Sequence, residues 1–288
     1  PAMTDPAIAY FTEDASVAAV TSRVGEGTDP RLARVMNALV THLHAFIKDV
    51  ELTQAEWALA VEFLTRTGQM CDGNRQEFIL LSDVLGVSML VDAINNRRPD
   101  GATENTVLGP FHVDGVPELP MSANISRDGV GESCLFQGHV TDFDGAPVAG
   151  ARIDVWSDNA DGFYDVQQPE SQPQPNNRGV FVTGADGRYA FQGIKPVSYP
   201  ISDDGPVGQM LGQLGRHPYR PAHMHFIVTA PGHQTIITHT FVKGDAYLTS
   251  DAVFGVKKTL IADYTATPEG PTDWQSTFDF IMTPEGTQ

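Results

Sequence analysis

The ten residues from His217 to Phe226 contain the side chains best suited to chemistry. His223 and His225 are two positions apart, and apolar residues fill the alternate positions. Because the side chains of a β-strand alternate between its faces, this spacing predicts both imidazoles on one face and the apolar set in a core. Two imidazoles on one strand face can bind a metal ion. A bare pair also fits a polar strand face, but the neighbouring Arg220, between two stiffening prolines, favours a functional site.

Further metal ligands would have to come from the long loops of the chain. Tyr164 follows a turn-rich segment directly after the strand expected to end at Trp156, and Tyr199 lies in a proline-rich loop. Long loops in compact domains are often functional. Taken alone, each tyrosine also fits a loop residue half-packed on a sheet. The residues by themselves therefore leave tyrosine, carboxylate and further histidine open as ligands.

The composition excludes several classes of partner. The chain has 36 Asp and Glu against 18 Lys and Arg, which gives a net charge of −18. Such a surface repels nucleic acid and anionic membranes, so neither is expected as a partner. The two cysteines have no paired spacing, and no apolar stretch approaches the roughly 20 residues of a membrane span. With no signal-peptide pattern either, we expect a cytoplasmic protein.

The region before residue 100 has the periodicity of helices. An apolar stripe runs from Leu32 to Ile47 after an Asp-Pro pair, which is a typical helix start. Thr53 and Glu56 form the pattern of a capping box that opens a second helix. A third helix is expected from about Gln76 to Ile94.

From about residue 133 the pattern changes to short strands and turns. Alternating segments such as Gly150–Trp156 and Thr235–Val242 are separated by turn residues or long loops. This pattern predicts a mainly β protein with an antiparallel β-sandwich. We expect residues 1–105 to form a helical dimerisation and linker region, and residues 106–288 to form the sandwich domain.

Four ordered motifs make the assignment specific. They are Asp161–Asp165, Tyr199–Ile201, Gly215–Phe226 and Lys243–Leu248. Together they resemble the intradiol ring-cleaving dioxygenases, which are non-haem Fe(III) enzymes that open catechols between the two hydroxyl groups. The resemblance runs from about residue 75 to residue 260, and helices before a sandwich also fit its catechol and hydroxyquinol branch.

The resemblance implies that Tyr164, Tyr199, His223 and His225 hold one Fe(III) ion. Two phenolates, one hydroxide and two neutral imidazoles balance a +3 charge, which a buried site requires. It also implies that Tyr199 leaves the metal with a substrate proton and thus acts as a base. Arg220 would stabilise negative charge on the ring.

Two positions, His239 and Asp83, indicate which substrate the enzyme would use. His239 stands where catechol-type relatives usually carry glutamine, and a histidine there is similar to the hydroxyquinol branch, which implies a role for it in the catalytic site. An acidic Asp83 facing an apolar pocket would accept a hydrogen bond from the third hydroxyl of hydroxyquinol, although it also fits a solvent-facing helix position. The pocket residues that the resemblance implies are Leu80, Asp83, Val84, Val107, Leu108, Gly109, Pro110, Phe111, Ile201 and Val253.

The sequence leaves open a second substrate class and a non-catalytic function, and the resemblance also implies how two chains would associate. Catechol or chlorocatechol is the alternative substrate, with cis,cis-muconates as products. The segment Gly138–Val155 also resembles transthyretin-like modules, which bind or support without catalysis. The resemblance further implies a homodimer formed by the N-terminal helices, with a phospholipid bound between them in some members.

Overall fold

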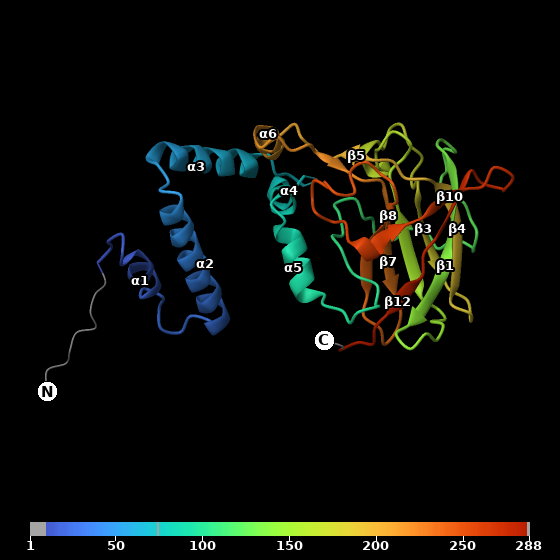
Figure 1. The fold of residues 1–288 in the computed structure, drawn as a ribbon, viewed down its shortest axis with the longest axis horizontal. Helices are drawn as coiled ribbons and strands as arrows, with labels where there is room; N and C mark the ends of the chain where they lie inside the picture. Colours follow the sequence, from blue (N-terminus) through green and yellow to red (C-terminus); the bar gives the residue numbers. More distant parts are fainter. Residues whose placement is uncertain (1–9, 74, 287–288) are drawn as a thin grey trace. The chain divides into compact units, whose positions relative to one another are not determined.

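A computed structural model describes residues 10–73 and 75–286 of the chain (Figure 1). The chain divides into two compact units, Pro1–Arg66 and Thr67–Gln288, and each is described by itself. None of the helices in the described part of the chain is long and apolar enough to cross a membrane.

The first unit is helical, and its caps are those that the sequence predicts. It contains α1 (Ser16–Thr21), α2 (Pro30–Asp49) and most of α3 (Gln54–Gln69). The Asp29 carboxylate accepts from the Leu32 amide at 2.8 Å, with Pro30 as the first helical residue. At α3 the Glu56 carboxylate accepts from the Thr53 amide at 2.9 Å, and the Glu56 amide donates to the Thr53 hydroxyl at 3.3 Å.

The third expected helix is two helices. These are α4 (Glu77–Val84) and α5 (Val87–Asn95), both in the second unit. The break lies at Gly86, whose φ of 73° places it in the left-handed region. A glycine in this conformation ends a helix at little steric cost. Apolar spacing continues across the break, which is why periodicity alone predicted one helix.

Two five-stranded sheets form the body of the second unit (Figure 1). One contains β1 (Ser133–Asp142), β4 (Arg188–Ile194), β10 (Tyr264–Ala266), β11 (Trp274–Thr277) and β12 (Phe280–Met282). The other contains β2 (Arg152–Trp156), β3 (Arg178–Val182), β7 (His223–Thr229), β8 (Ile236–Val242) and β9 (Ile261–Ala262). A two-stranded sheet joins β5 (Tyr199–Pro200) to β6 (Tyr219–Arg220), and α6 (Pro206–Gln213) lies between them in sequence.

The prediction of purely antiparallel sheets is wrong, because both large sheets are mixed. β1 pairs in parallel with β11 and with β12, and β8 pairs in parallel with β9. A parallel pair needs a long crossover connection, and residues 243–260 provide one between β8 and β9. Alternation within a strand does not encode the direction of its partner, so the sequence pattern could not reveal this.

The core lies between the sheets and fixes the face of β7. Phe136 and Phe191 come from one sheet, and Phe181 and Phe226 come from the other, all within one buried cluster. The apolar positions of β7, Met224, Phe226 and Val228, belong to the same cluster. The expected alternation along this strand is confirmed, since these residues fill the core while the two histidines lie on the opposite face.

Candidate metal centre and substrate pocket

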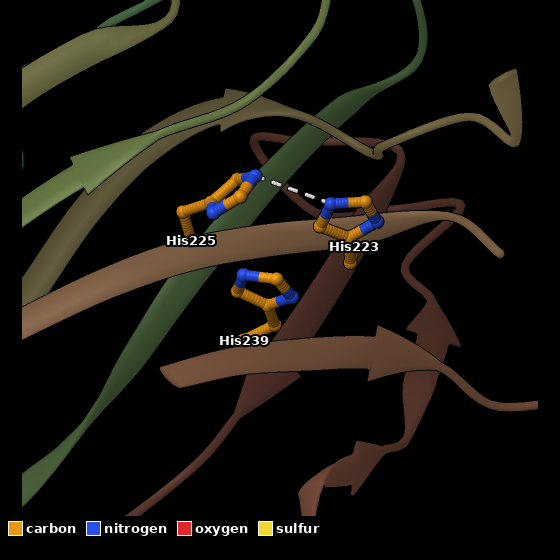
Figure 2. Close-up of side chains that lie close together, drawn as sticks. All are labelled: His223, His225 and His239. Carbon is orange, nitrogen blue, oxygen red and sulfur yellow. Dashed lines mark hydrogen bonds between the residues drawn. The ribbon is translucent and has the colours of Figure 1, made fainter. Parts of the chain in front are cut away.

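Three imidazoles come together on the face of the sheet that points away from the core. His223 and His225 lie on β7, and His239 lies on β8 directly opposite His225. All three are buried, and their ligand nitrogens lie within 4.8 Å of one another (Figure 2). The strand alternation and the pairing register together bring about this cluster.

Two phenols from loops complete the group. Tyr164 ends the loop after β2, and Tyr199 begins β5. The Tyr164 hydroxyl lies 2.8 Å from His225 Nε2 and 3.2 Å from the Tyr199 hydroxyl, which is 3.4 Å from His223 Nε2. The two Nε2 atoms are 3.1 Å apart. Four possible ligand atoms thus lie together: two from β7, one from the loop after β2 and one from β5.

The protonation of these groups fits a metal site. His223 is neutral, because burial and then the neighbouring Arg220 hold its pKa well below the usual value. Its Nδ1 lies 2.7 Å from the Pro221 carbonyl oxygen and must donate to it, so Nε2 offers a lone pair to the cluster. Burial and then His223 lower the pKa of His225 in the same way. Imidazole lone pairs facing two phenol oxygens form a donor set that could hold a metal ion.

Two glycines allow the backbone to pass close to candidate ligands. Gly162 has a φ of +82°, and a Cβ there would lie 2.9 Å from the Cβ of Tyr199. Gly109 has a φ of +80°, and its Cβ would lie 3.0 Å from Cε1 of His225. Both positions therefore require glycine for backbone conformation and for space.

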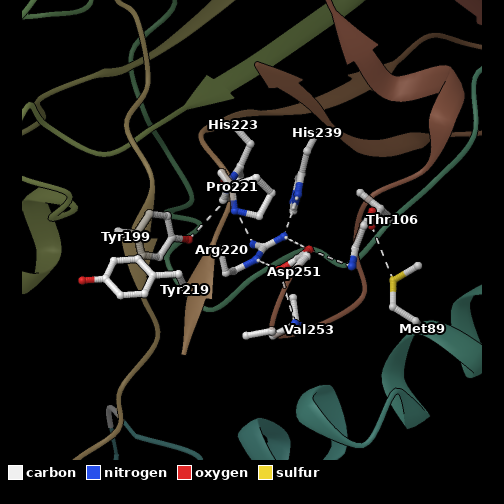
Figure 3. A network of polar contacts seen from close by, with 12 residues as sticks. Met89, Thr106, Tyr199, Tyr219, Arg220, Pro221, His223, His239, Asp251 and Val253 are labelled. Carbon is white, nitrogen blue, oxygen red and sulfur yellow. Dashed lines mark hydrogen bonds and ion pairs between the residues drawn. The ribbon is translucent and has the colours of Figure 1, made fainter. Parts of the chain in front are cut away.

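Arg220 lies against the imidazoles in the buried site (Figure 3). Its Nη1 is 3.1 Å from His223 Nε2, and its Nη2 is 3.4 Å from His239 Nδ1. The pairing of β5 with β6 places Arg220 opposite Tyr199. Burial opposes the charge of Arg220, but Asp251 and the tyrosines more than offset this and raise its pKa. The guanidinium therefore stays positive beside neutral imidazoles.

A cavity of about 1450 Å³ lies beside the cluster, because two of its lining residues, Gly109 and Phe111, contact candidate ligands. Its walls come from α4, α5, the segment 105–111 and neighbouring loops of the second unit. Gly109 lies against His225, and the Phe111 ring stacks on Tyr164 with centroids 4.6 Å apart. Gly109 and Phe111 thus stand between the cavity and the candidate ligands, and the cavity is large enough for a small aromatic molecule.

The comparisons with known proteins agree with this geometry. A family model described as "Dioxygenase" matches residues 109–284, and one described as "Catechol dioxygenase N terminus" matches residues 29–103. A hydroxyquinol 1,2-dioxygenase of a Rhizobium species is 58% identical over 88% of this chain and 86% of its own length. The chain belongs to the intradiol dioxygenase family.

Two other similarities support membership in the intradiol dioxygenases. A 6-chlorohydroxyquinol 1,2-dioxygenase of Cupriavidus pinatubonensis is 50% identical over 92% of this chain and 95% of its own length. The crystal structure of a Pseudomonas putida hydroxyquinol 1,2-dioxygenase aligns with a TM-score of 0.91 at 44% identity, covering 95% of this chain and 99% of that one. The mixed sheets and N-terminal helices are thus those of a family with solved structures.

Most of the pocket residues expected for this intradiol dioxygenase line the cavity. Those that do are Leu80, Asp83, Val107, Leu108, Gly109, Pro110 and Phe111. Val84, Ile201 and Val253 are not among its lining residues. Val84 and Val253 are buried. Ser202, which follows Ile201, does contact the cavity.

Sequence reasoning missed two buried carboxylates near the centre of the dioxygenase site. Asp165 follows Tyr164 and accepts from Nε of the buried Arg178 at 2.6 Å, which ties the tyrosine loop to β3. Asp251 accepts from Nε of Arg220 at 3.2 Å. Asp165 is the last residue of the Asp161–Asp165 motif, and Asp251 lies three residues after the Lys243–Leu248 motif. The signal that would have found them is a buried arginine, which needs an anionic partner.

Proposed function

We propose that this protein cleaves hydroxyquinol (1,2,4-trihydroxybenzene) with O2 in an intradiol reaction that yields 3-hydroxy-cis,cis-muconate, which tautomerises to maleylacetate. The observation that carries the proposal is the convergence of two phenol oxygens and two imidazole nitrogens beside a cavity. Relatives named hydroxyquinol 1,2-dioxygenase, 58% and 47% identical to this chain, support the choice of substrate.

One Fe(III) ion would be held by Tyr164, Tyr199, His223 and His225. Hard anionic phenolates favour Fe(III), and two imidazoles complete the set without adding charge. Bound iron would accept both diol oxygens and activate the ring toward O2. The lone pair of His223 Nε2 cannot serve an ion and Arg220 at once, so metal binding would release the 3.1 Å contact of Nη1.

Tyr199 would accept a proton from the substrate. Burial raises the pKa of this phenol, and Arg220 opposes the rise. Deprotonated Tyr199 would therefore be a strong base in this buried site. Burial raises the pKa of Tyr164 well above its usual value, and its ring is stacked on Phe111. Tyr164 would remain a ligand throughout.

Arg220, His239 and Asp83 would orient the ring and its charge. The Arg220 guanidinium would stabilise negative charge on the bound ring, and His239, buried and neutral, would hold Nη2 of the arginine. Asp83 lies on the cavity wall, where burial raises the pKa of its carboxyl, and a hydrogen bond from Ser88 and then the charge of Arg220 oppose the rise. Its carboxylate would accept a hydrogen bond from the third hydroxyl, which catechol lacks.

Colour and turnover test this function together. Iron-loaded protein should be red, because phenolate-to-Fe(III) charge transfer absorbs visible light. Its kcat/KM for hydroxyquinol should exceed that for catechol at least about tenfold, since catechol lacks the hydroxyl that would donate to the half-buried Asp83 carboxylate. Faster turnover of catechol would contradict the role of Asp83 and favour the catechol alternative. A colourless protein after loading with iron would overturn the metal assignment.

Two variants separate ligation from charge stabilisation. Tyr164→Phe should lose most of the visible band, whereas Tyr247→Phe, outside the cluster, should keep both band and rate. Arg220→Ala should keep the band but lower kcat about 10²- to 10³-fold, the usual cost of removing one electrostatic stabiliser. Full activity in Arg220→Ala would refute its role.

We also propose that the helical region within residues 1–105 forms a homodimer interface, with a phospholipid held between apolar helix faces, in a cytoplasmic protein. The support is the apolar side chains that α2 exposes along its length, among them Leu32, Leu39, Leu43 and Phe46. Light scattering should give twice the mass of one chain, and mass spectrometry of an organic extract should reveal the lipid. A monomer in solution would contradict the interface.

A further inference from the structure

The function proposed for Arg220 requires its guanidinium to stay at one place in a crowded, buried site. We propose that Asp251 is the positioning residue that holds this guanidinium beside His223 and His239. The inference rests on the proposed function, because it assigns the support of Arg220 and not the reaction itself. The hydrogen bonds of the Asp251 carboxylate go to Arg220 and to its own turn, and Asp251 is not among the residues that line the cavity.

The contact between the two side chains involves two points. Asp251 Oδ1 lies 3.2 Å from Nε of Arg220, and Oδ2 lies 3.4 Å from Nη2 (Figure 3). Both residues are almost fully buried, at 5% and 3% exposure. A carboxylate that meets two donors of a planar guanidinium fixes its rotation as well as its place. Nη1 is left to point at His223.

The carboxylate is itself held by the turn that carries it. Oδ2 accepts from the amide of Gly255 at 2.8 Å, and Oδ1 accepts from the amide of Val253 at 3.3 Å. Phe254 closes this turn with a φ of 60°, a left-handed conformation that is costly for an aromatic residue. Such a conformation persists only where the surroundings determine it. Here the Asp251 carboxylate accepts from the amides on both sides of Phe254, those of Val253 and Gly255.

Neighbouring groups anchor the turn and leave room for the pair. The Thr106 hydroxyl donates to the Gly255 carbonyl at 2.8 Å, and Nη2 of Arg216 donates to the Ala252 carbonyl at 2.9 Å. A Cβ at position 255 would lie 2.9 Å from Nη2 of Arg220 and 3.1 Å from Oδ2 of Asp251. Glycine at this position therefore lets the arginine approach the carboxylate.

A double-mutant cycle tests the inference on the iron-loaded full chain with hydroxyquinol. Asp251→Asn should lower kcat about 10- to 100-fold, because a small displacement of a catalytic group has that effect, while KM changes less than about threefold. The visible band should stay, since the ligands are untouched. In the Arg220→Ala background the same substitution should change kcat less than about twofold, since residues acting through one another are non-additive.

Each outcome of the cycle decides between the two claims. An equal loss of kcat from Asp251→Asn with and without Arg220 would overturn the positioning role and leave the proposed function intact. A normal rate in Arg220→Ala would overturn the role of the arginine itself. Asp263→Asn, which breaks the exposed pair with Lys243, is the matched control and should change nothing. If Asp251→Asn does not fold, Gly255→Ala crowds the same Nη2 without removing charge, and an unaltered kcat there would contradict the inference.

Discussion

The two sides of the metal cluster are built in different ways. The imidazole side stands on β7 and β8, where strand alternation and the pairing of His225 with His239 fix the side chains. The tyrosine side stands on two loops, where Gly162 permits close approach and the Arg178–Asp165 pair supplies a tether. A regular strand thus positions its ligands through the side chains that it packs into the core, whereas an irregular segment needs separate contacts for each ligand.

Removing a ligand from the strand side should have the largest effect. His225→Ala should lower kcat/KM to less than about one-thousandth of its original value, because removal of one ligand disables the ligand set that acts as a unit. The fold should persist, since Phe226 and Val228 still fill the core. Activity and thermal unfolding of His225→Ala are compared with those of His233→Ala, a partly exposed histidine in the turn after β7. Retained activity in His225→Ala would contradict the assignment of the strand side.

Breaking the tether should damage the loop side in a different way. Asp165→Asn leaves the charge of Arg178 buried without its partner, which should lower the free energy of unfolding by about 3 kcal/mol. It should also weaken the visible band, because the loop that carries Tyr164 loosens. Denaturant unfolding measures the first effect and absorbance the second. The exposed pair of Lys243 with Asp263 gives the comparison, since Asp263→Asn should cost less than about 1 kcal/mol.

The same contrast explains what the sequence could and could not predict. The period of two along β7 predicted which faces the histidines and the core residues would occupy, since it depends only on local geometry. Tyr164 and Tyr199 became candidates only through family motifs, because no periodicity links two loops that are 35 residues apart. The parallel pairing of β1 with β11 and the partners Asp165 and Asp251 depend on long-range packing, which a single sequence does not encode.

Crowding the two loops should have a smaller effect than cutting the tether. Gly162→Ala places a Cβ 2.9 Å from that of Tyr199 at a positive φ, so it should lower kcat about tenfold and stability by about 1–2 kcal/mol. Gly145→Ala is the matched control, because its φ is +87° but nothing lies within 4 Å of the added Cβ. It should show the backbone cost without the loss of rate. Equal rates in the two variants would mean that the approach of the loops is not critical.

The smallest expected effect is a difference in reactivity between the two free thiols, one on a strand and one in a loop. Cys134 is buried on β1, and burial raises the pKa of its thiol to about 12, whereas Cys71 lies half-buried before α4. At pH 8 only about one Cys134 thiol in 10⁴ is ionised in the folded state, so alkylation should modify Cys71 first.

The sign of the accompanying pH effect follows from the same shift. Above about pH 9 the unfolded chain releases the thiol proton while the folded chain keeps it, so stability should fall as pH rises toward 12. Cys134→Ala should show a shallower fall, by up to about 1.4 kcal/mol per pH unit, in denaturant unfolding between pH 9 and 10.5. Equal slopes for the two proteins, or equal alkylation of both cysteines, would contradict the burial of the Cys134 thiol in the folded core.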